Sequence, residues 1–227
     1  MAKKIFITGT GTDVGKTYIT GLIVKKLHES GVNAAYYKAA MSGNDRDAGG
    51  NLIPGDAKFV KEISKIDQTL DEMCPYIYET AVSPHLASRL EGNPVDLDVV
   101  KKEFELLCRK YDYVTMEGSG GILCPIRFDE TKLMLEDVIH ELGLSCILVA
   151  DAGLGTINSV VLTVEYMRNH GMDVKAIIFN HYVKGDVLHE DNLIMCEKMT
   201  GLKVIAKVSE NDTQIDIDSE ELKKLYE

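Results

Sequence analysis

The segment at residues 9–17, GTGTDVGKT, constrains this chain more than any other part of it. It follows an apolar run at residues 4–8 that predicts a buried strand. It precedes a stretch whose apolar side chains fall on one helical face, at Ile19, Leu22, Ile23 and Leu27. Glycines allow backbone N–H groups to turn inward, and the N-terminus of a helix adds positive potential. The segment therefore predicts a phosphate-binding loop between a strand and a helix.

Two residues of this loop have the side chains that nucleotide chemistry needs. Lys16 can reach the terminal phosphates, and the Thr17 hydroxyl can bind Mg²⁺. The spacing, G-x-x-x-x-x-G-K-T, is one residue longer than the common pattern. A dinucleotide-binding loop requires a glycine where Val14 stands and an acidic residue where Lys38 ends the next predicted strand. Both requirements fail, so the loop favours ATP-dependent phosphoryl transfer.

Short apolar runs alternate with longer amphipathic runs along the chain. Beyond the first strand and helix, we expect strands at residues 33–38, 113–116, 145–150, 174–180 and 203–208, and helices at 56–65, 83–91, 97–107 and 157–164. The polar, glycine-rich residues 42–55 predict a mobile loop. Apolar strands separated by helices are typical of a parallel sheet covered on both faces. We therefore expect one domain over residues 1–227, an α/β three-layer fold of the P-loop NTPase type with a mostly parallel sheet.

Charge and composition exclude several classes of protein. The formal net charge of −11 disfavours nucleic acid as a partner, because phosphate contacts need clustered lysine and arginine. The apolar run at the N-terminus is too short for a signal peptide, and no stretch has the length of a membrane span. The five cysteines include no C-x-x-C pair, which indicates reduced thiols. We expect a cytoplasmic protein that binds neither nucleic acid nor membrane.

Ionisable residues and glycines follow several of the predicted strands, where ligands bind in open parallel sheets. Lys38 can balance phosphate charge, or it can be a solvated lysine at a strand end. Glu117 stands where P-loop proteins place a carboxylate near magnesium, or it is a loop carboxylate. Asp56 is equally a helix N-cap or a metal ligand. The glycine-rich segment 153–158 opens a helix that can hold an anion, although tight packing explains it equally well.

Taken in order, these segments resemble one family. Residues 9–17 carry its long loop. The further matches, in the same order, are Tyr37-Lys38, Ser42-Gly43, Asp56-Ala57, Ser83-Pro84-His85, Glu117-Gly118-Ser119-Gly120-Gly121, Leu154-Gly155-Thr156-Ile157-Asn158 and Asn180. The chain is similar to dethiobiotin synthetases from residue 4 to about residue 181. The loop alone is moderately specific, whereas the ordered set is strongly so.

The resemblance implies an ATP- and Mg²⁺-dependent ligase of biotin biosynthesis that acts as a homodimer. Its substrates are 7,8-diaminopelargonic acid and CO₂, which form a carbamate. ATP phosphorylates the carbamate to a carbamic-phosphoric anhydride, and the second amine displaces phosphate to close the ureido ring of dethiobiotin. The substrate supplies both nucleophiles, so the protein mainly positions them and neutralises charge.

The same resemblance assigns roles to individual residues. Lys16 and Lys38 are the catalytic pair. The ligands of Mg²⁺ are Thr17, Asp56 and Glu117. The nucleotide-binding set is Thr12, Asp13, Val14, Gly15, Lys16, Thr17, Tyr18 and Asn180, with Asn180 at the adenine. The substrate-binding set is Thr12, Lys38, Ser42, Gly118, Gly155, Thr156, Ile157 and Asn158, and the last four hold the substrate carboxylate across the dimer interface.

The sequence departs from the family pattern at four places. Gly11 stands where aspartate is frequent, Asp13 where glutamate is common, and Ala39 where proline is usual. A late Gly-x-Ile-Pro turn is absent around residues 206–209, which affects the purine side of the site.

Two rivals use the same loop. A MinD/ParA-like switch ATPase is the alternative function, but its family has a lysine at the position of Gly11 and often ends in a basic amphipathic helix that residues 219–227 do not form. An amide synthetase of the cobyrinate type normally has an amidotransferase portion, for which this chain has no room.

Overall fold

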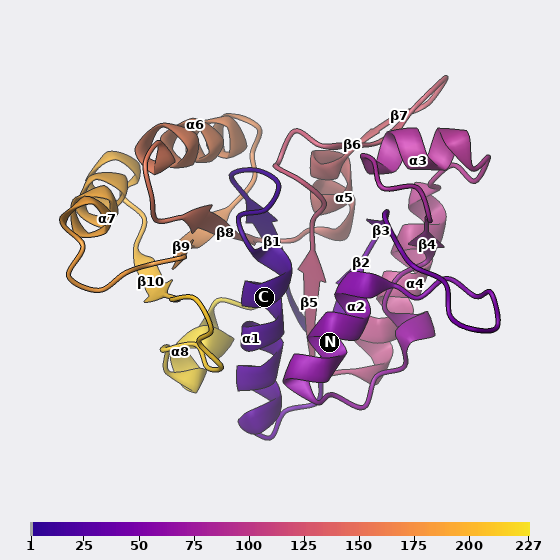
Figure 1. Cartoon of the computed structure of the whole chain (residues 1–227), viewed down its shortest axis with the longest axis horizontal. Helices are drawn as coiled ribbons and strands as arrows, with labels where there is room; N and C mark the ends of the chain where they lie inside the picture. The colour runs from indigo at the N-terminus through magenta and orange to yellow at the C-terminus, as the bar shows by residue number, and fades with distance from the viewer. Residues whose placement is uncertain (1) are drawn as a thin grey trace.

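The computed structural model describes residues 2–227, and its centre is a six-stranded sheet (Figure 1). All pairings in this sheet are parallel, and the strand order is β10-β9-β8-β1-β5-β2. The bounds are β1 (Lys3–Gly9), β2 (Ala34–Lys38), β5 (Tyr113–Glu117), β8 (Cys146–Asp151), β9 (Val174–Asn180) and β10 (Val204–Lys207). All six strands predicted from the sequence are confirmed, and none of their ends shifts by more than one residue.

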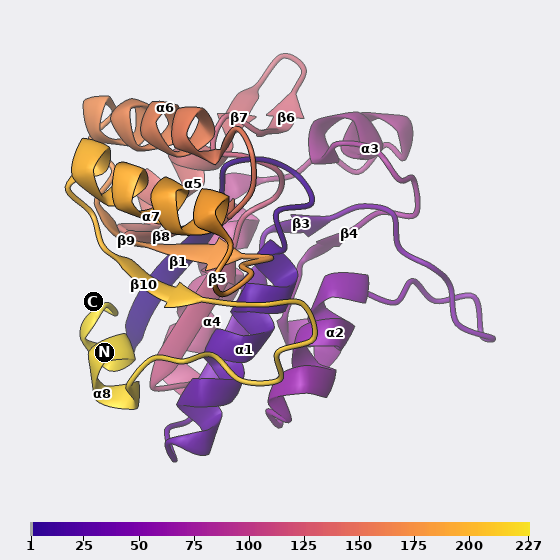
Figure 2. The same ribbon diagram turned by 60° about the vertical axis from the view of Figure 1, so that its left-hand side comes forward.

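Helices cover both faces of this sheet, which gives the three predicted layers (Figures 1 and 2). One core joins Ile5 and Ile7 to α1 (Lys16–Glu29), α2 (Gly55–Ser64) and α8 (Ser219–Lys224). The other core joins Phe6 to the helices of the opposite face, α4 (Leu97–Lys110), α5 (Leu135–Leu142), α6 (Thr156–Asn169) and α7 (Val187–Thr200). Neighbouring residues of β1 serve different cores because side chains alternate along a strand. The predicted α/β fold class is confirmed.

Several small elements were not predicted. Two short strand pairs flank the sheet, β3 (Ala40–Met41) with β4 (Tyr76–Ile77) and β6 (Pro125–Phe128) with β7 (Lys132–Met134). A 3₁₀ turn (Leu70–Glu72) was likewise not predicted, whereas α3 (Pro84–Leu90) confirms the helix expected at residues 83–91. Helix α7 gives little hydrophobic periodicity, because its buried side chains are Asn192, Cys196 and Thr200 while its apolar Val187 is 81% exposed. Its stabilising contacts are partly polar, so a pattern of apolar residues could not reveal it.

The edge strand β2 is closed by one buried side chain. The Gln68 amide accepts from the backbone N–H of Tyr36 at 2.8 Å and donates to its carbonyl at 2.9 Å. These bonds satisfy backbone groups that an edge strand otherwise leaves exposed to another chain. They also fix β2 beside β5, where the register pairs Lys38 with Glu117.

The parallel register brings the carboxyl ends of the central strands to one edge. Lys38 lies beside Glu117, and Asp151 at the end of β8 lies beside Asn180 at the end of β9. The phosphate-binding loop begins at the same edge, after β1. Within residues 2–227, no helix has the length and apolar character needed to cross a membrane.

Candidate active site

The loop at residues 9–17 turns where β1 enters α1, as the sequence predicts. Gly15 has φ +85°, a left-handed conformation that favours glycine. A Cβ atom built at Gly15 would lie 2.0 Å from Nδ2 of Asn180, so this glycine also permits the loop to approach β9. The Lys16 side chain is 7% exposed and folds back over the loop, where Nζ donates to the Gly11 carbonyl at 2.8 Å.

A cluster of opposite charges lies next to the loop. Nζ of Lys38 donates to Oδ2 of Asp56 at 2.6 Å and to Oε1 of Glu117 at 2.7 Å. The same Glu117 oxygen accepts from the Thr17 hydroxyl at 2.8 Å. The three predicted magnesium ligands therefore meet around the predicted catalytic lysine. Lys38 is only 6% exposed, so its interpretation as a solvated lysine at a strand end is wrong. Glu117 is 1% exposed, so its interpretation as a loop carboxylate is wrong as well.

Asp56 belongs to the first turn of α2 and is not its cap. The cap is Pro54, and no side chain accepts a bond there. The N-cap interpretation of Asp56 is therefore wrong, and its carboxylate instead bonds Lys38. The predicted start of the helix at residue 56 was one residue late.

The charges of this cluster support one another. Burial by itself would lower the pKa of Lys38, but the carboxylates of Glu117 and Asp56 outweigh burial and raise it. Burial and the nearby Lys38 lower the pKa of Lys16. Burial would raise the pKa of Asp56, yet the Lys38 ammonium more than offsets it, and the pKa is lowered. Lys38 is thus held as a cation and Asp56 as an anion.

Tyr36 is a part of this cluster that the sequence analysis missed. Its hydroxyl is fully buried and donates to Oε2 of Glu117 at 3.0 Å, so both oxygens of this carboxylate have donors. The signal was available, because residues two apart on a strand share a face, and Tyr36 lies two before Lys38. In an apolar strand, however, a buried tyrosine is equally typical of the core.

One cavity of about 880 Å³ joins the loop and the charge cluster. Of the residues assigned to ligands from the sequence, it is lined by Thr12, Asp13, Gly15, Lys16, Thr17, Lys38, Ser42, Asp56 and Glu117. Its other walls, to which the sequence analysis assigned no ligand, include Met41, Val82, Pro84, Ser119 and Cys124. These walls were hard to predict because they come from separate parts of the chain, namely β3, the start of α3 with the residue pair before it, and the connection between β5 and β6.

The other predicted residues lie beside this cavity or away from it. A Cβ atom at Gly118 would lie within 3 Å of the Phe6 and Leu135 side chains, so packing also requires this glycine. Asn180 reaches the back of the loop, where its Nδ2 donates to the Val14 carbonyl at 3.1 Å. Tyr18 donates its hydroxyl to the Asp212 carbonyl and ties α1 to the chain after β10.

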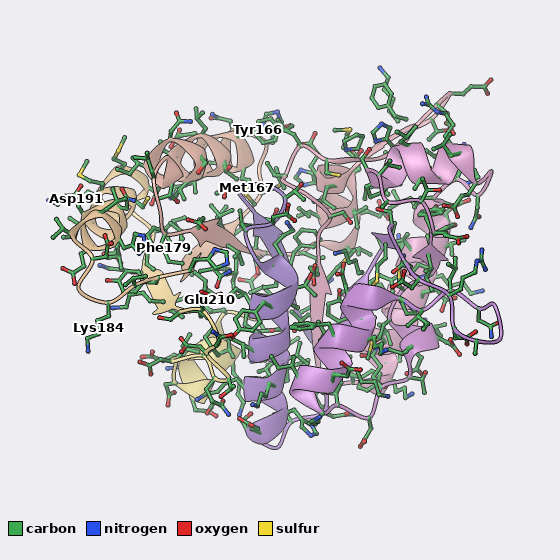
Figure 3. The ribbon with its side chains drawn as sticks, viewed as in Figure 1. Tyr166, Met167, Phe179, Lys184, Asp191 and Glu210 are labelled. Atoms are coloured by element: carbon green, nitrogen blue, oxygen red, sulfur yellow. The ribbon has the colours of Figure 1, made fainter. Side chains whose placement is uncertain are left out.

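Residues 155–158 lie at the N-terminus of α6, and Gly155, Ile157 and Asn158 line a second groove of about 590 Å³ with α7. Gly155 has φ +90°, and the buried Thr156 hydroxyl has no partner among residues 2–227. Figure 3 shows Asp191 on α7 in this part of the molecule, and its apolar neighbours Leu162 and Met199 are 62% and 52% exposed. Within one chain, therefore, this segment does not line the cavity of the loop.

The fold and this loop define a P-loop nucleotide-binding protein. A family model described as an AAA domain matches residues 3–216. The MinC:MinD cell division protein complex of Aquifex aeolicus superposes with a TM-score of 0.57 at 14% identity, over 92% of this chain and 82% of that chain. A ParA family ATPase from Chlorobium tepidum gives 0.54 at 13% identity, over 93% and 85%. At such low identity these likenesses show the fold alone.

Relatives at higher identity identify the family. A protein of Brachyspira hyodysenteriae named ATP-dependent dethiobiotin synthetase BioD is 47% identical over all of both chains. A protein of the same name from Clostridium perfringens is 48% identical over all of this chain and 98% of its own. The chain belongs to the ATP-dependent dethiobiotin synthetase family, and it is an enzyme. The resemblance inferred from the motifs is thereby confirmed.

The contact between Gly15 and Asn180 gives a prediction with a matched control. Gly15→Ala should weaken ATP binding at least about tenfold, because the new methyl group displaces Asn180 and a left-handed alanine costs about 1–2 kcal/mol. Gly11→Ala should bind ATP normally, because apart from its chain neighbours no atom of residues 2–227 lies within 4 Å of a Cβ at Gly11. Titration calorimetry measures both affinities, and equal affinities would contradict the prediction.

Proposed function

We propose that this enzyme closes the ureido ring of dethiobiotin from 7,8-diaminopelargonic acid, CO₂ and ATP. The observation that carries the proposal is the position of Lys38 between two carboxylates, in one cavity with Lys16 and the phosphate-binding loop. Phosphoryl transfer needs positive charge beside the migrating group and carboxylates near its metal. Both requirements meet here in residues from four separate elements.

The chemistry requires three steps. One amine of the substrate and CO₂ form a carbamate, with loss of a proton. A carbamate oxygen then attacks the γ-phosphorus of ATP, and ADP leaves. The second amine attacks the carbonyl carbon of the resulting anhydride, and phosphate leaves as the ring closes. Each step places negative charge near Lys16 or Lys38, whose ammonium groups stabilise it at a fixed position.

The donor set fits Mg²⁺. Thr17, Asp56 and Glu117 offer one hydroxyl and two carboxylates, the hard oxygen ligands that this ion prefers. When bound, the ion neutralises charge on the β- and γ-phosphates. The Glu117 carboxylate is fixed in position by three hydrogen bonds that it accepts, from Tyr36, Thr17 and Lys38.

The α6 end supplies the remaining specificity. The helix N-terminus and residues 155–158 suit the carboxylate of the substrate, and the Thr156 hydroxyl has no hydrogen-bond partner in the part of the chain that the structure describes. Because these residues line a different groove from Lys16 within one chain, we propose that they serve the cavity of a second copy. The exposed apolar residues of that groove, including Leu154 at 92% exposure, suit such a homodimer interface.

Omitting components one at a time tests the reaction. ADP release should require the diamine, bicarbonate and Mg²⁺ together, because without the carbamate no acceptor stands beside the γ-phosphate. Coupled assay of ADP with each component left out, and with EDTA added, measures this requirement. ATP turnover that ignores the diamine would overturn the proposal and favour a switch ATPase.

Lys38→Met tests the catalytic role of the central cation. We expect kcat to fall at least about a hundredfold, the usual cost of removing one group that stabilises transition-state charge. Lys58→Met removes an exposed lysine of α2 and should leave kcat unchanged. Lys38→Met leaves the buried Glu117 carboxylate without its cation, and the double variant Lys38→Met/Glu117→Gln removes that unpaired charge. It should regain thermal stability without regaining turnover, and a normal kcat in Lys38→Met would refute the role.

Leu162→Glu tests the dimer. The added charge in the exposed α6–α7 groove should convert a dimer to monomers and abolish turnover. Val99→Glu, on the exposed side of α4, should change neither. Sedimentation velocity measures the oligomeric state. A Leu162→Glu variant that is fully active as a monomer would exclude a site shared between copies.

A further inference from the structure

A chain of hydrogen bonds runs behind the phosphate-binding loop and ends on Asn180. Nδ1 of His181 lies 2.6 Å from Oδ2 of Asp151, and Nε2 of His181 lies 3.2 Å from Nδ2 of Asn180. Nδ2 of Asn180 in turn donates to the Val14 carbonyl at 3.1 Å. None of these contacts uses the catalytic cluster around Lys38, and neither Asp151 nor His181 has a role in the reaction described above.

The backbone holds His181 over its neighbour. His181 has φ +54°, the left-handed conformation that histidine, asparagine and aspartate adopt more readily than most residues. Asn180 is the last residue of β9 and His181 is the next, so this turn folds the imidazole back beside the amide. Figure 3 shows Phe179, the residue before Asn180, in the interior, and Lys184, three residues after His181, pointing into solvent.

Asp151 fixes the tautomer of the ring. Its Oδ1 accepts from the backbone N–H of Gly153 at 2.7 Å, which leaves Oδ2 for His181. Burial would raise the pKa of Asp151, but the bonds from His181 and Gly153 lower it, so the carboxylate is ionised and accepts. An ionised carboxylate only accepts, so the ring donates to it from Nδ1, and Nε2 serves as the acceptor toward Asn180.

An acceptor at Nε2 determines how the Asn180 amide is turned. Both Nδ2 hydrogens are then used, one by the Val14 carbonyl and one by the imidazole. Oδ1 is buried and finds no donor among residues 2–227. A buried acceptor without a donor is costly, and a ligand that brings an N–H group to it recovers that cost.

We propose that His181, oriented by Asp151, is a positioning residue that locks the Asn180 amide so that Oδ1 selects nucleotides whose base carries an exocyclic amino group. The proposal rests on the base contact of Asn180 in the proposed function. An adenine amino group would donate to Oδ1. A keto oxygen at the same position would face a second acceptor, and the locked amide could not rotate to offer its N–H groups instead.

The matched ligands are ATP and inosine triphosphate, which differ at this position by an amino group and a keto oxygen. We expect the enzyme to prefer ATP by about tenfold or more in kcat/KM, as when a buried polar group is left unpaired. The preference should appear in KM and in binding affinity measured by calorimetry, because the base lies away from the transferred phosphate.

Three variants separate the parts of the lock. His181→Asn keeps the left-handed turn and can still bond Asp151, but it is too short to reach Asn180, so the preference should shrink severalfold. Asp151→Asn keeps the ring but permits the other tautomer, whose Nε2–H opposes the Asn180 donor, and the preference should shrink likewise. His181→Gln returns an acceptor at greater reach and should restore part of it. Lys184→Ala, on the exposed side of the same turn, should match the parent enzyme.

Asn180→Ala distinguishes the two levels of the proposal. If it abolishes the preference while His181→Asn and Asp151→Asn retain it fully, Asn180 reads the base and the lock is wrong. If Asn180→Ala itself retains the preference for ATP, the base contact in the proposed function is wrong, and the proposed positioning role of His181 is then wrong as well. Unchanged circular dichroism and thermal midpoints in all variants establish that the preference, and not the fold, has changed.

Discussion

The site depends on one buried ion cluster at the junction of β2 and β5. Glu117 is almost fully buried, and removing a carboxylate from water is costly unless donors and an opposite charge surround it. Lys38 supplies the charge, while Thr17 and Tyr36 supply hydroxyls to its two oxygens. The same bonds place a cation and two carboxylates beside the phosphate-binding loop. The interactions that stabilise the buried charge are therefore those that fix the geometry on which the proposed chemistry depends.

That cluster needs the parallel register and a fixed sheet edge. Lys38 is the last residue of an edge strand, and only the pairing of Tyr36 and Lys38 with β5 brings both side chains to Glu117. Gln68 closes the open side of the strand by bonding both backbone groups of Tyr36. A side chain outside the sheet thus holds in place a tyrosine and, two residues on, the central lysine.

A second constraint acts on the opposite side of the loop. Gly15 and Asn180 approach so closely that only a glycine fits, and Asn180 is held from behind by His181 and Asp151. The loop is therefore braced by β9 as well as by its own helix. The ion cluster and the Asn180 contact thus lie at the ends of β5 and β9, two strands that are separated in the sheet by β1 and β8.

The sequence by itself determined the loop, the six central strands and the family, because these depend on local signals. A glycine-rich turn, an apolar run and an ordered set of motifs can all be recognised in the sequence without knowledge of the tertiary contacts. Prediction was weaker where stability came from polar burial, as in α7, whose inward residues are Asn192, Cys196 and Thr200. It also missed short elements such as α5, although its inward residues are apolar.

Only the tertiary structure decided between the alternatives at single residues. At Asp56 the structure excludes the helix cap, because α2 begins one residue earlier and the carboxylate bonds Lys38, while the role as metal ligand stays a prediction. The sequence pattern places Tyr36 in the core of a strand, and only the structure shows that its hydroxyl donates to Glu117 on the neighbouring strand. No motif or periodicity in the sequence pointed to His181. Each of these roles arises from contacts between residues that are far apart in the chain or fixed by a backbone turn, and no local pattern of residue types encodes such contacts.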